Sequence, residues 1–304
     1  MKSAAENPQV VGSYLEEERK AGRVVGPLCP EDYPFVHTSS LGGILKSTPG
    51  KWRLIVDLSS PEGGSVNDGI RESWCSLAYA TVDDAVRGIA NHGQGALLIK
   101  VDIRSVYRVV QIHPDDRRLM GMLWEGSLFV DTALPFGLRS GPKIFTALAD
   151  AAEWIVRQQG LNFVIHYLDD FLLVMSPDGY QGEHALRILL ESFERLGLPV
   201  AWDKLEGPTT CLTFLGFQLD STQWEVRLPR SKLEATRQEV RQWVERKTGT
   251  WRELESIVGK LAHASRVVKP GKTFRRHLFE LLSAVSRAHH HVHLWVAARS
   301  DLLW

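Results

Sequence analysis

Two adjacent carboxylates lie between two short, strongly apolar runs near the middle of the chain. The run 161–167 (LNFVIHY) precedes Leu168-Asp169-Asp170, and the run 171–175 (FLLVM) follows. Each run has the length of a strand and is rich in β-branched, aromatic or leucine side chains. The pattern predicts a β-hairpin whose tip carries Asp169 and Asp170.

Aspartates at a tight turn are ordinarily hydrated turn residues with no further role. The two apolar runs change this interpretation, because their burial would hold the turn rigidly. Rigid neighbouring carboxylates without a basic neighbour in sequence repel one another unless a cation lies between them. The hairpin tip is therefore a candidate metal site.

A third acid fits the same hypothesis. The apolar run 96–101 ends at Asp102, and alternation over 107–113 predicts that a strand resumes there. If the strand ending at Asp102 pairs beside the hairpin, Asp102, Asp169 and Asp170 converge and offer oxygen ligands suited to Mg²⁺ or Mn²⁺. Two such ions roughly 3.5–4 Å apart activate a hydroxyl and stabilise a leaving phosphate oxygen. The chemistry indicated is phosphoryl or nucleotidyl transfer.

Four short segments follow one another along the chain. They are Val101-Asp102 with Tyr107 five residues later, Leu134-Pro135-Phe136-Gly137-Leu138-Arg139-Ser140-Gly141-Pro142, Tyr167-Leu168-Asp169-Asp170, and Phe214-Leu215-Gly216-Phe217. In this order they resemble the motif series of retroelement reverse transcriptases, and the resemblance runs from about Gly42 to the C-terminus. The sequences of the second and third segments, and of 259–279, are similar to those of DIRS-type retrotransposons in particular.

The resemblance implies an α+β fold, the right-hand polymerase with fingers, palm and helical thumb. Apolar periodicity independently predicts two helices, over 140–159 and around 186–196, which would cover one face of an antiparallel palm sheet. We expect a partly ordered N-terminal arm over 1–40 and the first part of the fingers over 41–92. The palm, with the remaining fingers elements and the primer grip, is expected over 93–225, and a basic helical thumb or connection over 226–304.

The resemblance also implies roles for individual residues. Asp102, Asp169 and Asp170 are the expected catalytic acids, and together with the backbone at Ile103 they are the expected ligands of two Mg²⁺ or Mn²⁺ ions. The residues expected to contact the incoming dNTP are Lys46, Arg53, Tyr107, Phe136, Gly137 and Lys204. The residues expected to contact the primer end are Leu215, Gly216 and Phe217.

Several of these residues also have a plain structural interpretation. Lys46 suits the protection of an exposed sheet edge, and Tyr107 suits a core aromatic whose hydroxyl is bonded. Lys204 suits a surface turn, and Gly216 suits an ordinary hairpin bend. In the family, an aromatic ring at the position of Tyr107 excludes a 2′-hydroxyl and so selects deoxynucleotides.

Charge is distributed unevenly along a chain whose net charge is zero. Residues 226–304 contain 16 Lys+Arg and 7 Asp+Glu, a net of +9, whereas residues 1–225 contain 20 and 29, a net of −9. A basic C-terminal third favours a polyanionic partner, although solvated helix faces also carry such charges. In the same region, Ser231 with Glu234 and Thr250 with Glu253 have the form of capping boxes.

Other features constrain the environment of the protein. The chain has no apolar stretch long enough for a membrane span and no signal peptide, so no membrane partner is expected. Three widely separated cysteines favour a reducing compartment, the cytoplasm or the nucleus. Glu16-Glu17-Glu18 is interpreted as a solvated helix face, and His289–His293 as a solvated tract at a helix end.

The expected activity is RNA-directed DNA synthesis by a nucleotidyltransferase, with an RNA or DNA template, a primer strand and dNTPs as partners. Two alternatives stay open, a domesticated nucleic-acid binder without synthesis and a metal-dependent nuclease. Phe136 stands where many retroviral relatives have Gln, which keeps the first alternative in view. Related elements carry a ribonuclease H region after this point, and no such activity is expected of these residues. Oligomeric state does not follow from the sequence.

Overall fold

The computed structural model describes residues 2–45, 52–246, 248–284 and 290–303. The chain divides into two compact units. The first unit comprises Met1–Gly88 and Leu97–Pro208, and the second comprises Ile89–Ala96 and Thr209–Trp304. The helix α3 (Val82–His92) spans the boundary between them in sequence.

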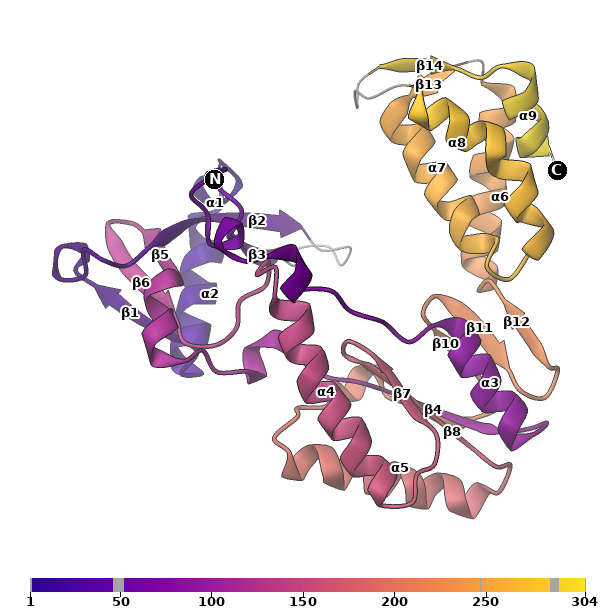
Figure 1. Cartoon of the computed structure of the whole chain (residues 1–304), viewed down its shortest axis with the longest axis horizontal. Helices are drawn as coiled ribbons and strands as arrows, with labels where there is room; N and C mark the ends of the chain where they lie inside the picture. Colours follow the sequence, from indigo (N-terminus) through magenta and orange to yellow (C-terminus); the bar gives the residue numbers. More distant parts are fainter. Residues whose placement is uncertain (1, 46–51, 247, 285–289, 304) are drawn as a thin grey trace. The chain divides into compact units, whose positions relative to one another are not determined.

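A four-stranded sheet in the first unit has the order β7-β8-β4-β9, and β8 pairs antiparallel with both β7 and β4. Helices α4 (Gly141–Gln158) and α5 (Gly179–Arg195) pack on this sheet (Figure 1). One buried core joins Ile99 and Phe171 of the sheet to Phe145 of α4 and Leu189 of α5. The predicted α+β fold, with an antiparallel sheet and two covering helices, is confirmed. The strands are β4 (Leu97–Asp102), β7 (Val164–Tyr167), β8 (Asp170–Met175) and β9 (Glu206–Thr209).

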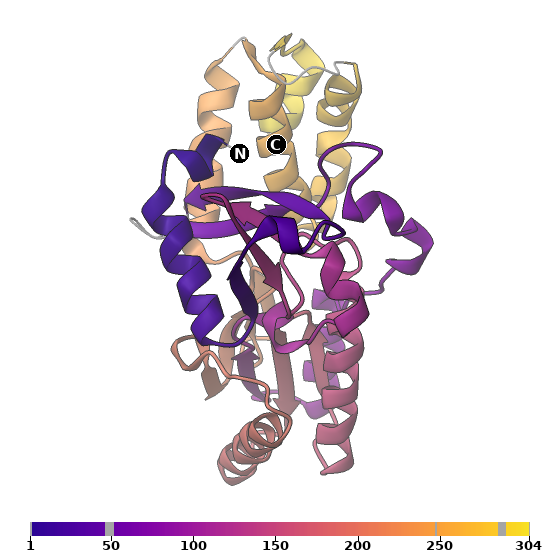
Figure 2. The same cartoon turned by 90° about the vertical axis from the view of Figure 1, so that its left-hand side faces the viewer.

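A five-stranded sheet in the same unit has the order β1-β6-β5-β2-β3. Helices α1 (Lys2–Ala5) and α2 (Pro8–Lys20) precede it, and α2 lies beside the sheet (Figure 2). Val11 and Leu15 of α2 are buried in one cluster with Leu41 and Leu54 of the sheet. Glu18 of α2 is only 7% exposed, so the expectation of a solvated face is wrong at this residue. The strands are β1 (Val24–Leu28), β2 (Thr38–Leu45), β3 (Trp52–Asp57), β5 (Gly121–Trp124) and β6 (Ser127–Asp131).

The predicted strand over 107–113 is wrong. A one-turn 3₁₀ helix, η4 (Val106–Val109), occupies its first part, and Gln111 forms only an isolated bridge with Ala133. Strand alternation would have required the arginine at 108 to face water, but Arg108 is 5% exposed. The other short 3₁₀ helices are η1 (Pro30–Asp32), η2 (Val66–Gly69), η3 (Glu72–Trp74), η5 (Pro114–Leu119), η6 (Trp202–Lys204) and η7 (Lys269–Arg275).

The second unit joins a small sheet to a helical bundle. The order of the sheet is β10-β11-β12, and Trp243, Ile257 and Leu278 lie in the core of the bundle. The elements are β10 (Cys211–Phe214), β11 (Phe217–Asp220), β12 (Glu225–Arg227), α6 (Arg230–Glu245), β13 (Thr248–Thr250), α7 (Trp251–Ala264), α8 (Arg276–Ser283), β14 (His291–His293) and α9 (Val296–Leu303).

The capping predictions for this bundle have different outcomes. Thr250 and Glu253 form the predicted capping box of α7. The box at Ser231 does not form, because α6 begins at Arg230, which places Ser231 inside the helix, and Glu234 instead accepts a hydrogen bond from Arg230. His291–His293 is a strand paired with β13 rather than a helix end, but His290, His291 and His293 are exposed to solvent as expected. His289 lies outside the described residues. In the described part of the chain, no helix has both the length and the apolarity needed to cross a membrane.

Replacing Gly249 by alanine is expected to destabilise the helical bundle. A Cβ atom at Gly249 would lie 2.4 Å from the Trp243 ring, whose residue is 2% exposed and has no room to move. Overpacking of this kind costs about 1–3 kcal/mol. Gly259→Ala is the matched control, since a Cβ there meets no atom within 4 Å. Alanine inside a helix is more stabilising than glycine by about 0.5–1 kcal/mol. Chemical denaturation of the two variants should therefore shift the midpoint in opposite directions.

Candidate active site

The turn between β7 and β8 holds its residues in a strained conformation. Tyr167 pairs with Asp170, which leaves Leu168 and Asp169 as a two-residue loop. Leu168 has a φ of 52°, a region that branched side chains rarely adopt. A two-residue hairpin loop nevertheless demands positive φ at its first position. The buried strands on either side enforce the turn, which places Asp169 at the tip and Asp170 at the start of β8.

Asp102 is the last residue of β4 and lies directly opposite Asp170 in the ladder. The Ile103 N–H donates to the Asp169 carbonyl oxygen at 3.0 Å. Side chains alternate across a strand, and the neighbouring Val101 and Phe171 belong to the core under α4 and α5. Asp102 and Asp170 therefore lie on the opposite face of the sheet. The pairing brings the three predicted acids together at one end of the sheet.

The charges at this end of the sheet are not balanced. Asp102 is 5% exposed, and its Oδ2 accepts a hydrogen bond from Lys204 Nζ at 2.8 Å. This hydrogen bond raises the pKa of Lys204. Burial, together with the charges of Asp169 and Asp102, raises the pKa of Asp170 to about 6. The charges of Lys100 and Lys204 act on Asp170 in the opposite direction, but the three acids outnumber these two lysines, so the site favours an added cation.

The donor set fits a divalent cation in charge and chemistry, since carboxylate oxygens are the ligands that Mg²⁺ and Mn²⁺ prefer. Asp102, Asp169 and Asp170 would hold it. Among the residues that the structure describes, no three His, Cys, Asp or Glu side chains already form a metal-binding group. One oxygen of Asp102 is instead bonded to Lys204. Ile103, the expected backbone ligand, is 1% exposed and bridges to Val200.

Removing the Lys204 charge is expected to tighten divalent-cation binding. The ammonium occupies an oxygen of Asp102, but its side chain is 56% exposed, so its interaction is screened by solvent. We expect Lys204→Met to lower the dissociation constant for Mn²⁺ about two- to fivefold, in keeping with the modest strength of exposed pairs. Lys20→Met, at the exposed end of α2, is the control. A Mn²⁺ titration followed by electron paramagnetic resonance measures both, and weaker binding by Lys204→Met would contradict the assignment.

Tyr107 stands on η4, where its ring contacts two aromatic neighbours. The Tyr107 ring meets Phe136 edge-on with centroids 5.0 Å apart, and Phe145 at 6.1 Å. Burial, with the nearby Tyr79 hydroxyl and the Asp169 charge, raises the pKa of Tyr107. Tyr107 is thus in contact with Phe136 and within electrostatic reach of Asp169. Tyr79, which packs against Tyr167 with ring centroids 4.8 Å apart, was missed because an isolated tyrosine gives no pattern in sequence.

The loop that carries Phe136 and Gly137 is fixed by a residue that the sequence did not reveal. Gly137 has a φ of 99°, and a Cβ there would lie 3.0 Å from the Val56 carbonyl oxygen. The Asn67 side chain donates to the Gly137 carbonyl at 2.9 Å and accepts from the Arg139 N–H at 2.8 Å. Asn67 is 4% exposed, so both bonds are shielded from water. Its place in a Ser-Val-Asn-Asp-Gly turn gave no signal, because turns favour asparagine in any case.

The expected triphosphate contacts are only partly described. The strands β2 and β3 form an antiparallel pair, with Ile44 opposite Arg53. Lys46 lies outside the described residues, and so does the Arg53 side chain. Their roles stay predictions.

The predicted primer grip is a tight hairpin of the second unit. Leu215 and Gly216 form the two-residue loop between β10 and β11, and their φ angles are 47° and 82°. The loop is packed against α7, since the His263 ring stacks on Phe217 with centroids 4.2 Å apart and a plane angle of 7°. A Cβ at Gly216 would lie 2.9 Å from Lys232 Nζ. Because this atom is the end of a flexible side chain that can move aside, the glycine is favoured mainly by its positive φ.

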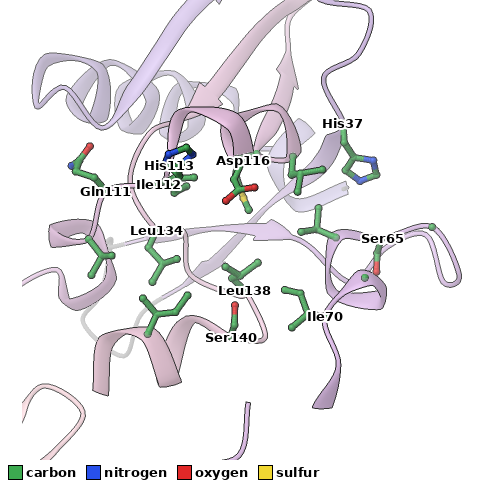
Figure 3. A pocket seen from close by; sticks show the side chains of 17 residues that line it. His37, Ser65, Ile70, Gln111, Ile112, His113, Asp116, Leu134, Leu138 and Ser140 are labelled. Carbon is green, nitrogen blue, oxygen red and sulfur yellow. The ribbon is translucent and has the colours of Figure 1, made fainter. Parts of the chain in front are cut away.

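A cavity of about 510 Å³ lies elsewhere in the first unit (Figure 3). Leu134, Leu138, Ile112 and Ile70 line it, and none of the three acids does. Its described lining includes Asp116 but no lysine or arginine, so it lacks the groups that bind a triphosphate. The acid cluster, rather than this cavity, is the candidate active site.

Known proteins resemble this chain over part of their length. The chain is 24% identical over 216 residues to the Gag-Pro-Pol polyprotein of Mason-Pfizer monkey virus, which covers 68% of the chain and 11% of the polyprotein. An uncharacterized protein of Caenorhabditis elegans is also 24% identical, over 58% of the chain and 14% of that protein. The chain thus spans about a tenth of the length of these curated relatives.

Solved structures share the fold. The foamy viral protease-reverse transcriptase in complex with double-stranded DNA superposes with a TM-score of 0.70 at 18% identity, over 97% of this chain and 46% of that chain. The same viral protein in complex with an RNA/DNA hybrid gives a TM-score of 0.69 at 18% identity, over 98% and 36%. The fold is therefore that of the right-hand polymerases.

A family model decides the affiliation. The model described as reverse transcriptase (RNA-dependent DNA polymerase) matches residues 44–219, more than half of the 304 residues. This match includes the strand end at Asp102, the hairpin tip and the predicted primer grip. The chain belongs to the reverse transcriptase family.

Proposed function

We propose that this protein is an RNA-directed DNA polymerase that extends a primer 3′-hydroxyl with dNTPs. The observation that carries the proposal is the β4–β8 register, which sets Asp102 opposite Asp170 and beside the strained tip at Asp169. Family membership supports the reaction class. Two divalent cations bound by these acids would supply activation of the 3′-hydroxyl and stabilisation of the leaving pyrophosphate.

The chain's own residues have distinct tasks in this proposal. Lys46 and Arg53 neutralise the triphosphate, and Lys204 lies beside Asp102 where it can donate a proton to the leaving pyrophosphate. Tyr107 excludes a ribose 2′-hydroxyl, and its contact with Phe136 supports this role. Phe136 and Gly137 lie against the nascent base pair. Leu215, Gly216 and Phe217 hold the primer end.

The proposal extends to partners and origin. The template is RNA or DNA paired with a primer, and the basic residues of 226–304 contact the duplex through its phosphates. Relatives of the same fold have been solved with double-stranded DNA and with an RNA/DNA hybrid, which supports this partner class. The similarity of the motif sequences to those of DIRS-type retrotransposons supports an origin in such an element. The unpaired, scattered cysteines support a place in the cytoplasm or nucleus.

Primer extension tests the function. A labelled DNA primer annealed to a heteropolymeric RNA template is incubated with the protein, four dNTPs and Mg²⁺, with parallel reactions lacking dNTPs or containing EDTA. A polymerase lengthens the primer only when both dNTPs and Mg²⁺ are present. Binding without extension identifies a nucleic-acid-binding remnant, and strand cleavage in the absence of dNTPs identifies a nuclease. Either of these two outcomes overturns the proposal.

A further inference from the structure

Three buried charged side chains and one half-buried arginine form a cluster beside the five-stranded sheet. Glu18 of α2, Arg108 of η4 and Asp131 of β6 are 7%, 5% and 3% exposed. Arg23 completes the cluster with two hydrogen bonds to the Glu18 carboxylate, at 2.8 and 2.7 Å. Burying charges costs several kcal/mol per ion unless geometry and hydrogen bonding are nearly complete. The stability of such a buried cluster therefore depends on accurate hydrogen-bond geometry.

Arg108 is the centre of this geometry. Its guanidinium donates to Glu18 Oε2 at 2.9 Å and to Asp131 Oδ1 at 2.7 Å. It also donates to the carbonyl oxygens of Ala133 at 3.0 Å and Arg23 at 3.3 Å. Hydrogen bonds from Arg23 and Arg108 outweigh burial and lower the pKa of Glu18, so this partner is ionised. The planar guanidinium thus has one orientation, set by α2, by β6 and by two backbone segments.

Tyr107 is the residue immediately before Arg108 on the same short 3₁₀ helix. The backbone on its other side is also constrained, because Ser105 has a φ of 55° and its carbonyl accepts from the Arg108 N–H at 2.7 Å. The Tyr107 ring has aromatic neighbours in Phe136 and Phe145. A displacement of the Arg108 backbone would therefore shift the Tyr107 ring relative to Phe136 and Phe145.

We infer that Arg108 is a positioning residue for Tyr107, and that the N-terminal helix α2 takes part in sugar selection through the Glu18–Arg108 bond. This inference rests on the proposed function, since it concerns the nucleotide site of that reaction. It gives the N-terminal segment a task that its sequence does not suggest. Exclusion of a 2′-hydroxyl depends on the position of the Tyr107 ring. Weakening the hydrogen bonds that hold Arg108 should therefore allow a ribonucleotide to bind more easily.

The test compares nucleotide discrimination in matched variants. Glu18→Gln and Asp131→Asn each remove one charge from the cluster while keeping the shape of the side chain. Glu16→Gln is the control, because Glu16 lies on the same helix but pairs with Arg19 at the exposed surface. Single-nucleotide incorporation gives kcat/KM for a dNTP and for the corresponding rNTP. Tyr107→Val gives the ratio of these two values in the absence of the aromatic ring that excludes a 2′-hydroxyl. Circular dichroism melting establishes that each variant is folded at the assay temperature.

We expect the dNTP-to-rNTP ratio to fall about tenfold in Glu18→Gln and Asp131→Asn, within the roughly hundredfold effect of a ~1 Å misplacement. Most of the change should appear in KM and kcat for the rNTP, and Glu16→Gln should keep the wild-type ratio. A purely structural role would reduce the folded fraction and so lower kcat equally for both nucleotides. An unchanged ratio in either folded variant overturns the inference. If the wild type itself incorporates no nucleotide, the proposed function fails instead.

Discussion

Asp169→Asn is expected to lower the rate of primer extension by roughly 10³-fold or more, as removal of a group that stabilises transition-state charge does. Affinity for the primer–template duplex should stay near that of the wild type. Asparagine has the shape of aspartate but no charge, and it suits the turn as well as aspartate does. The substitution therefore removes the charge at the hairpin tip and keeps the strained Leu168 loop.

The expected split between binding and catalysis follows from the location of the acid. Asp169 is part of a cluster that already has an excess of negative charge, so its neutralisation cannot weaken the attraction of the protein for a polyanion. Divalent-cation binding should weaken instead, because a hard cation prefers charged oxygen ligands. Single-turnover extension measures the loss of catalytic rate. Fluorescence anisotropy with a labelled duplex measures the affinity for the primer–template.

A matched acid serves as the control for this experiment. Asp115 is exposed on η5 and lies outside the cluster, so Asp115→Asn should extend primers at the wild-type rate. Extension by Asp169→Asn at more than about a tenth of the wild-type rate would contradict the assignment, since such a loss is smaller than that of a catalytic charge. Loss of duplex affinity in proportion to activity would point to a misfolded variant rather than to missing chemistry.

The hairpin and the strand end could be predicted because their signals are local. Apolar runs of strand length flank Asp169 and Asp170, and another such run ends at Asp102. The register that sets Asp102 opposite Asp170 is a pairing between distant segments, which periodicity does not encode. Family resemblance supplied this expectation where local physics could not.

The errors at Glu18 and over 107–113 share one physical cause, the burial of charged residues. A sequence pattern assigns Glu18 and Arg108 to solvent, because single charges are rarely buried. Glu18 and Arg108 are instead buried together as an ion pair, although they are 90 positions apart in the sequence. This long-range pairing turns a predicted strand at Tyr107 into a 3₁₀ helix and brings α2 into the core. Asn67 was missed for a similar reason, since its partners Gly137 and Arg139 are 70 and 72 positions away.

Arg108→Met is expected to destabilise the first unit by about 3–5 kcal/mol, the cost of leaving buried charges without their partner. Glu18 would retain Arg23, whose side chain is 29% exposed and so partly hydrated. Asp131 would retain no cation among its described salt bridges, and burial already raises its pKa to about 6. The variant should therefore unfold at a lower denaturant concentration, followed by circular dichroism, whereas Arg118→Met at the exposed surface should not.

A triple variant separates lost charge pairing from lost packing. Glu18→Leu and Asp131→Leu, combined with Arg108→Met, replace the three most buried charges by apolar groups. Such replacements are often neutral or stabilising by about 1–4 kcal/mol, because the desolvation of the ions is no longer needed. We expect the triple variant to regain most of the stability that Arg108→Met loses. If it is no more stable than Arg108→Met, the uncompensated charges are not the cause of the loss, and the cluster acts through its shape alone. If it is stable but discriminates poorly between dNTP and rNTP, the charges serve the position of Tyr107 rather than the stability of the fold.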